Sequence, residues 1–140
     1  MTHAGPRCER NVDVHVLLDE ARVVVVDKPS GLTSEEVSRQ FGRRLVHRID
    51  RGTSGLLVLA DDARTVTRLQ RALRAGAVAR TYLFVAHGVL RAARLDDVLV
   101  RDGGDGRRGV ARDHDQATTG KRAITDVTPI LSSPFATLGL

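Results

Sequence analysis

The chain has 140 residues, and its 22 lysines and arginines against 17 aspartates and glutamates give a formal charge of +5 at pH 7. Hydrophobic residues make up 41% of the sequence, which excludes a disordered tail and allows one domain or part of a larger one. A single cysteine, Cys8, excludes an internal disulfide bond and favours a reducing compartment. No apolar run approaches the ~18 residues of a membrane span and residues 1–11 lack a signal segment, so we predict a cytoplasmic protein without a membrane partner.

Arginine dominates the positive charge, because Lys28 and Lys121 are the two lysines of the chain. The guanidinium group binds phosphate and stacks on bases, which favours a nucleic-acid partner. A GC-rich genome enriches arginine as well, so composition alone leaves both explanations open.

Two β segments are predicted after a loose leader at residues 1–11. They cover residues 14–18 and 23–26, with Asp19-Glu20 in the turn between them. The four consecutive valines of the second segment show no polar alternation, which predicts a strand buried on both faces. Lys28-Pro29-Ser30-Gly31 ends this strand, because proline donates no backbone hydrogen bond and these residues favour turns.

A short helix is predicted next by the capping-box pattern Thr33-Ser34-Glu35-Glu36, in which Thr33 caps the helix. Gly42 is its predicted end. The turn residues Gly52-Thr53-Ser54-Gly55 then precede a second buried strand over residues 56–60.

A longer helix is predicted over residues 63–75, capped by Asp61 or Asp62 and closed by Gly76. Its apolar face consists of Val66, Leu69 and Leu73. Arginines lie roughly opposite at steps of four, three and three, at positions Arg64, Arg68, Arg71 and Arg74. This stripe has two interpretations, a solvated helix face and a contact with RNA phosphates.

Several strands are predicted in the second half of the chain. Residues 80–87 alternate and predict a half-buried strand, residues 95–100 predict another, and residues 102–109 form a loop. Two more strands are predicted over residues 121–131 and 136–140. Strands outnumber helices and come in adjacent pairs, so the predicted fold class is α+β, with a mixed, largely antiparallel sheet and a few flanking helices.

The densest cluster of chemistry-bearing residues is His47-Arg48-Ile49-Asp50-Arg51. A carboxylate between two arginines favours its ionised form, and a loop that leads into a strand presents such a group well. A surface ion-pair cluster is the alternative interpretation. Asp113-His114-Asp115 predicts a solvated loop and no metal site, because consecutive residues rarely converge on one ion.

Three segments, taken in order, resemble the catalytic domain of the RluA-type pseudouridine synthases, which isomerise uridine in ribosomal or transfer RNA. They are VVVVDKPSGL (residues 23–32), LVHRIDRGTSGLLVLA (45–60) and RTYLFVAHG (80–88). The second resembles the signature His-Arg-Leu-Asp followed by Thr-Ser-Gly, with Ile49 where leucine is usual. The resemblance implies that residues 12–140 form a partial pseudouridine synthase catalytic domain, incomplete at its C-terminal side.

The resemblance also implies roles for single residues. Asp50 would be the catalytic aspartate, acting as nucleophile or as base. Arg48 would help to hold the target uridine out of the RNA, and Tyr82 would pack on the uracil ring. Arg51 and His47, beside the aspartate, are also assigned to substrate binding. The family uses neither a metal nor an organic cofactor, and the partner would be ribosomal or transfer RNA.

A third motif of the family would follow residues 136–140, and it supplies a basic partner of the aspartate and further strands. Because this motif would lie beyond the sequence, one hypothesis is that the chain is a fragment that does not fold stably or needs a partner chain to complete its sheet. Two functions follow: an RNA pseudouridine synthase with an essential aspartate, and an RNA-binding remnant of such an enzyme without activity.

Overall fold

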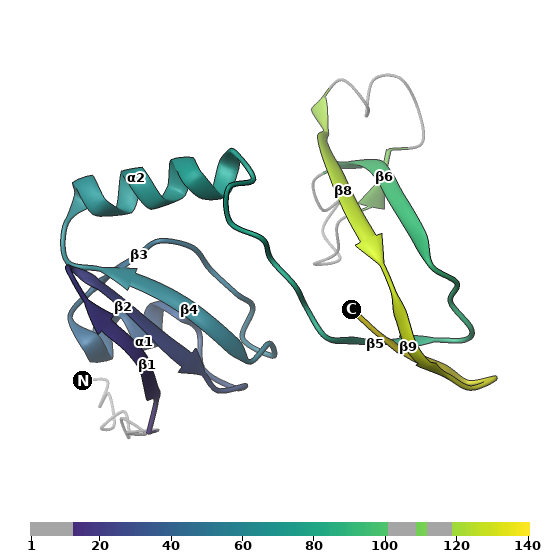
Figure 1. The fold of residues 1–140 in the computed structure, drawn as a ribbon, viewed down its shortest axis with the longest axis horizontal. Coiled ribbons are helices and arrows are strands. Elements are labelled where there is room, and N and C mark those ends of the chain that lie inside the picture. The colour runs from purple at the N-terminus through teal and green to yellow at the C-terminus, as the bar shows by residue number, and fades with distance from the viewer. Residues whose placement is uncertain (1–12, 101–108, 112–118) are drawn as a thin grey trace, which may run out of the picture. The chain divides into compact units, whose positions relative to one another are not determined.

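A computed structural model describes residues 13–100, 109–111 and 119–140. The chain divides into two compact units, residues 1–79 and 80–140 (Figure 1). The first unit holds β1 (His15–Glu20), β2 (Val23–Lys28), α1 (Ser34–Phe41), β3 (Arg44–Leu45), β4 (Gly55–Ala60) and α2 (Ala63–Arg74). The second holds β5 (Phe84–His87), β6 (Ala93–Val100), β7 (Gly109–Val110), β8 (Lys121–Val127), β9 (Pro129–Ser132) and β10 (Ala136–Gly139). Every strand pair in these ranges is antiparallel, which confirms the predicted α+β class.

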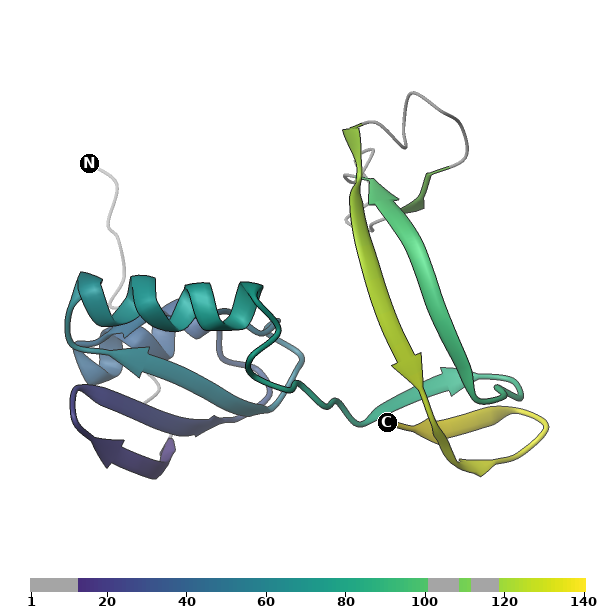
Figure 2. The same cartoon turned by 45° about the horizontal axis from the view of Figure 1, so that its top comes forward.

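The sheet of the first unit has the strand order β1-β2-β4-β3 (Figures 1 and 2). Its two central strands supply the core, in which α1 contributes Val37 and the segment before β1 contributes Val14. Burial alternates along β2, because Val24 and Val26 are buried while Val23 and Val25 are half-buried. The prediction that this strand is buried on both faces was therefore wrong, since the buried residues of the core lie on one face of the sheet.

The turn between β1 and β2 consists of Ala21 and Arg22, and Asp19-Glu20 belongs to strand β1. Both turn residues have positive φ, 41° and 75°, as the tight turns of hairpins require. Asparagine and glycine are the usual residues at such positions, and neither is present here. The predicted turn was misplaced by two residues for this reason.

Both predicted helices are present, and their ends match the local signals. Thr33 caps α1 through the predicted capping box with Glu36, and Gly42 ends the helix in the left-handed conformation, with φ of 62°. Asp62 caps α2 by accepting a hydrogen bond from the Thr65 amide. The last helical residue is Arg74, one position earlier than predicted.

The described residues of the second unit form two three-stranded sheets, with the orders β5-β10-β9 and β7-β6-β8. The strand predicted over residues 121–131 is broken at Thr128, whose amide and carbonyl both bond to Leu140. Pro129 follows and donates no hydrogen bond, so β8 pairs with β6 while β9 pairs with β10.

The strand predicted over residues 80–87 is shorter than expected, because β5 begins at Phe84. Its partner β10 pairs Gly139 with Phe84, so the register of this pair ends there. Residues 80–83, although included in the predicted strand, are therefore not part of this strand pair.

Three features of the sequence lie outside the described residues: the leader with Cys8, the loop at residues 102–108 and the Asp113-His114-Asp115 segment. Neither helix in the described part of the chain has the length and apolarity needed to cross a membrane.

Candidate active site

The loop between β3 and β4 carries four of the five residues assigned to the site: His47, Arg48, Asp50 and Arg51. Asp50 is exposed, whereas strand β4, which follows the loop, is part of the core. The Thr53 amide donates to the Asp50 carbonyl over 3.0 Å, which closes a turn directly after the aspartate. Asp50 is thus a solvent-facing carboxylate at the start of a tight turn.

Ser34 holds the loop on the N-terminal side of Asp50. Its hydroxyl donates to the Ile49 carbonyl over 2.9 Å and accepts from the Ile49 amide over 3.1 Å. Ser34 is 1% exposed, so water does not compete well for these two bonds. The backbone of the residue just before Asp50 is therefore fixed to the first turn of α1.

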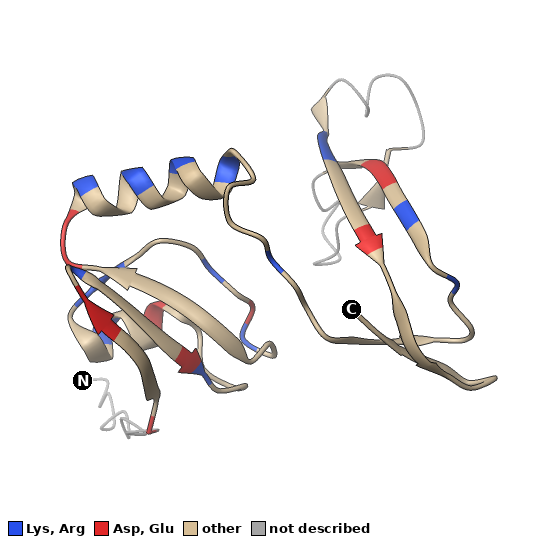
Figure 3. Cartoon of the chain, viewed as in Figure 1, with Lys and Arg blue, Asp and Glu red and all other residues tan. Residues whose placement is uncertain are grey.

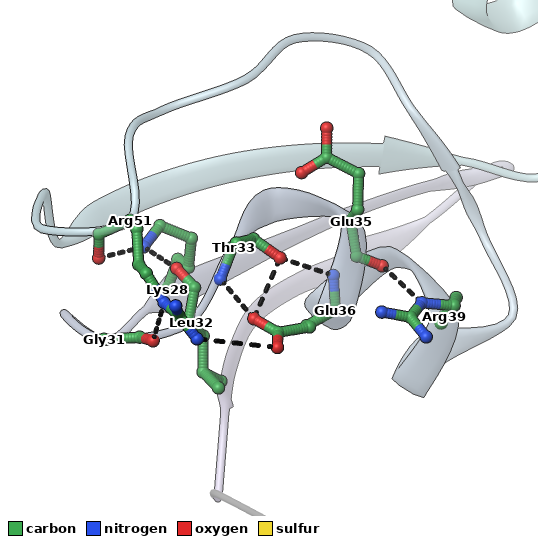
Figure 4. Close-up of polar contacts among 8 residues, drawn as sticks. All are labelled: Lys28, Gly31, Leu32, Thr33, Glu35, Glu36, Arg39 and Arg51. Atoms are coloured by element: carbon green, nitrogen blue, oxygen red, sulfur yellow. Dashed lines mark hydrogen bonds and ion pairs between the residues drawn. The ribbon is translucent and has the colours of Figure 1, made fainter. Parts of the chain in front are cut away.

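The segment after β2 holds the loop on the C-terminal side of Asp50 (Figure 4). The Gly31 amide donates to the Arg51 carbonyl over 2.8 Å, and the Arg51 Nε donates back to the Gly31 carbonyl over 2.8 Å. Ser30 Oγ adds a bond to the Gly52 carbonyl, at 3.0 Å. Residues 49, 51 and 52 are all anchored, so the backbone at Asp50 is held in one place.

Lys28 lies beneath this loop, and sequence reasoning did not assign it to the site. It is 0% exposed, and its ammonium donates to the carbonyls of Leu32 (2.7 Å), Pro29 (3.0 Å) and Arg51 (3.4 Å). Burial lowers the pKa of Lys28, and the nearby negative charges of Asp50 and Glu36 act in the opposite direction. The signal in the sequence was Lys-Pro-Ser-Gly directly after an apolar strand, which we interpreted as a strand end only.

The two arginines that flank Asp50 both meet carboxylates of α1. Arg48 Nε lies 3.0 Å from Glu35 Oε1, and an Arg51 guanidinium nitrogen lies 3.8 Å from Glu36 Oε1. Hydrogen bonds from Thr33, followed by the charge of Arg51, lower the pKa of Glu36. Arg51 is held at two points and Arg48 at one exposed ion pair, and such pairs contribute little. Arg48 is therefore the arginine that is freer to turn to another anion.

His47 lies at the start of the loop and is half-buried. The Val58 amide of β4 donates to its Nε2 over 3.2 Å, so this nitrogen carries a lone pair in the folded chain. The Val46 amide donates to the Val58 carbonyl over 3.1 Å, which docks the same segment on β4. In this arrangement His47 ties the loop to the sheet.

Tyr82, the fifth assigned residue, belongs to the second unit and is 52% exposed. It lines a pocket of about 510 Å³, together with Arg80, Phe84, Asp126 and other residues of that unit. A ring beside an arginine is a surface on which a planar base could stack. No cluster of metal-ligating side chains occurs in the part of the chain that the structure describes.

Solved structures with the same fold are pseudouridylate synthase domains. A human RNA pseudouridylate synthase domain containing 4 matches 89% of this chain and 57% of its own, with a TM-score of 0.67 and 22% identity. A human RNA pseudouridylate synthase domain containing 1 matches 96% of this chain and 60% of its own, with a TM-score of 0.69 and 17% identity. The fold is thus that of a pseudouridylate synthase domain.

The sequence model of the RNA pseudouridylate synthase family matches residues 22–138, and the chain therefore belongs to this family. Among curated relatives, a ribosomal large subunit pseudouridine synthase D of Pseudomonas aeruginosa is 26% identical over 96% of this chain. An uncharacterised RNA pseudouridine synthase of Zymomonas mobilis is 34% identical over 53% of this chain. The chain spans less than half the length of either relative, 44% and 41%.

Proposed function

We propose that this chain is an RNA pseudouridine synthase, an isomerase whose catalytic carboxylate is Asp50. The observation that carries the proposal is the exposed Asp50 on a loop whose residues 49, 51 and 52 are bonded to Ser34, Gly31 and Ser30. A catalytic group that is held in place before the substrate arrives loses little entropy in the reaction. Membership of the family supports the same reaction.

The reaction breaks the bond between ribose C1′ and uracil N1, turns the base and joins C1′ to uracil C5. The hydrogen on C5 leaves as a proton, and N1 takes up a proton, so the atoms of the base are conserved. The Asp50 carboxylate would act as nucleophile or as base in these steps. No electron is gained or lost, so the isomerisation needs no redox partner.

The target uridine must leave its base stack before the carboxylate can reach it, and a flipped base is held by stacking and by hydrogen bonds. Arg48 would contribute to holding it, since its ion pair with Glu35 is exposed and exchangeable. Tyr82 would stack on the uracil ring, and His47 and Arg51 would keep the loop in place around the substrate.

The substrate in this proposal is ribosomal or transfer RNA, and the relatives' names favour large-subunit ribosomal RNA. The single cysteine favours the cytoplasm as the location. Transcripts of both RNA classes, tested side by side, would decide between them.

The test is tritium release from RNA transcripts labelled at C5 of uridine. We expect release by the native chain, complete loss in Asp50→Asn, and unchanged release in Asp19→Asn, which neutralises an exposed carboxylate on β1. Loss of tritium release in both variants would show that removing either carboxylate charge abolishes activity, which would refute a specific role of Asp50. Folded protein that binds RNA without release would refute the proposal and favour the alternative, an RNA-binding protein without isomerase activity.

A partner chain that completes a sheet also remains part of the proposal. It is supported by exposed apolar side chains of the second unit, in particular Val85, Leu131 and Phe135. Light scattering and chemical crosslinking with the purified chain test it, because a soluble monomer at micromolar concentration that is active alone would refute the need for a partner.

A further inference from the structure

The outer face of α2 carries a row of arginines that the candidate active site does not use. The row, here called the α2 arginine stripe, consists of Arg64, Arg68, Arg71 and Arg74. At 3.6 residues per turn the first three fall within an arc of about 60°, and the row extends over about 15 Å. All four residues are exposed, and Figure 3 shows the basic positions following one side of the helix along its length.

The residues on the opposite side of α2 pack on the first unit, so the stripe faces solvent. Val66, Leu69 and Leu73 on the opposite side are half-buried, and Thr65 is buried. Gln70 Nε2 donates to the Val46 carbonyl over 3.1 Å. Val46 directly precedes His47, so α2 is bonded to the start of the loop that carries Asp50, within the same compact unit.

Among the described residues, no carboxylate forms an ion pair with an arginine of the stripe. The sequence of α2 contains neither aspartate nor glutamate, and none of the four arginines forms an ion pair within the described ranges. The arginines at other positions that do form ion pairs are Arg22, Arg43, Arg48, Arg51, Arg94 and Arg122. Arg39, Arg44, Arg80 and Arg91 also form no ion pair within the described ranges, but α2 is the element that places four such arginines in one row.

The spacing of the stripe brings like charges close together on the surface of α2. Like charges three or four residues apart repel each other, and this spacing recurs three times along the row. Arg64 places a positive charge in the first turn, next to the positive end of the helix dipole, whereas Arg71 and Arg74 lie in the last turn, where positive charge is favourable. A polyanionic ligand would relieve the repulsion between neighbouring arginines.

We propose that the α2 arginine stripe is a second RNA-binding surface, which grips the phosphates of the substrate RNA outside the nucleotide that is isomerised. The inference rests on the proposed function for the identity of the RNA. Guanidinium groups bind phosphate oxygens in bidentate fashion, and a row of four over about 15 Å suits successive phosphates of a strand. An anionic membrane fits less well, because the apolar face of α2 is packed on its own unit and cannot enter lipid.

The experiment measures the Kd of three proteins for a labelled stem-loop of large-subunit ribosomal RNA by fluorescence anisotropy. The KCl concentration is varied from about 50 to 300 mM, because phosphate contacts weaken strongly over roughly this range. The three proteins are the native chain, the stripe variant R64Q/R68Q/R71Q and the control variant R22Q/R94Q/R122Q. Both variants lose three charges, but the control arginines are exposed and already paired with carboxylates. We expect the slope of log Kd against log salt to fall by about 2–3 in the stripe variant, with about 10- to 100-fold weaker binding near 150 mM salt.

An equal loss in both variants, or an unchanged slope in the stripe variant, would overturn the proposal. Binding of the native chain to phosphatidylserine vesicles that the stripe variant loses, with unchanged RNA binding, would overturn it in favour of a membrane. The thermal midpoint of the stripe variant should equal or exceed that of the native chain, so that weaker binding is not caused by unfolding. Tritium release separates this proposal from the proposed function. If the stripe variant releases tritium and binds RNA normally, only the RNA-binding role of the stripe is refuted. If none of the three proteins releases tritium, only the isomerase activity is refuted.

Discussion

Replacing Lys28 by methionine tests whether the buried ammonium holds the loop that carries Asp50. Methionine keeps an unbranched stem of similar length but donates no hydrogen bond. The variant leaves the carbonyls of Leu32, Pro29 and Arg51 without the donor that the native chain provides. The change therefore acts on the backbone of the loop and leaves the sequence of the loop intact.

The magnitude follows from the contacts and the burial of Lys28. Hydrogen bonds from a charged donor contribute about 1.5–3 kcal/mol each, and two of the three bonds are short, at 2.7 and 3.0 Å. The variant also avoids the desolvation of an ammonium that is 0% exposed, which offsets part of this loss. We expect a decrease in the free energy of unfolding of about 2–4 kcal/mol, or a drop in Tm of roughly 10–20 °C for a unit of this size.

Urea unfolding and tritium release measure the two consequences, and Lys121→Met is the matched control. Lys121 is the other lysine of the chain and is exposed on β8, so its replacement removes the same charge without these contacts. We expect K28M to lose both stability and release while K121M retains both. A K28M protein within about 0.5 kcal/mol of the K121M protein would refute the reasoning, because surface changes have effects of that size.

Two further predictions concern the supports of the loop and of α2. Ser34→Ala removes both hydrogen bonds to the Ile49 backbone. The rate of tritium release in a single-turnover assay should fall about 10-fold, and the free energy of unfolding in urea should fall by about 1–2 kcal/mol. Unchanged release would show that Asp50 is positioned without Ser34. The second prediction concerns pH: the amide of Thr65 and then its hydroxyl lower the pKa of Asp62 to about 2. Because this folded value lies below the usual unfolded value near 3.9, the stabilisation by the carboxylate is present above about pH 4 and is lost as pH falls through about 2. The Tm of the native chain should thus exceed that of Asp62→Asn at about pH 6 and approach it near pH 2, and a gap independent of pH would contradict the assignment.

Local sequence determined the elements whose signals lie within a few residues of each other. The capping box at Thr33 and the stop at Gly42 defined α1, since both act through bonds inside one turn. The order of apolar and polar segments indicated the antiparallel α+β class, and the signature around Asp50 indicated the family. These features need no knowledge of distant parts of the chain.

Only the tertiary structure decided how the loop around Asp50 is held. Lysine is usually exposed, and the burial of Lys28 depends on carbonyls from residues as far away as Arg51. The bonds from Ser34 to Ile49 join positions 15 residues apart, which no local pattern encodes. The break at Thr128 likewise depends on Leu140, because a strand continues only where another backbone offers it hydrogen bonds. Sequence therefore singled out Asp50 as the candidate carboxylate, while long-range packing and backbone pairing decided which groups hold the backbone around it.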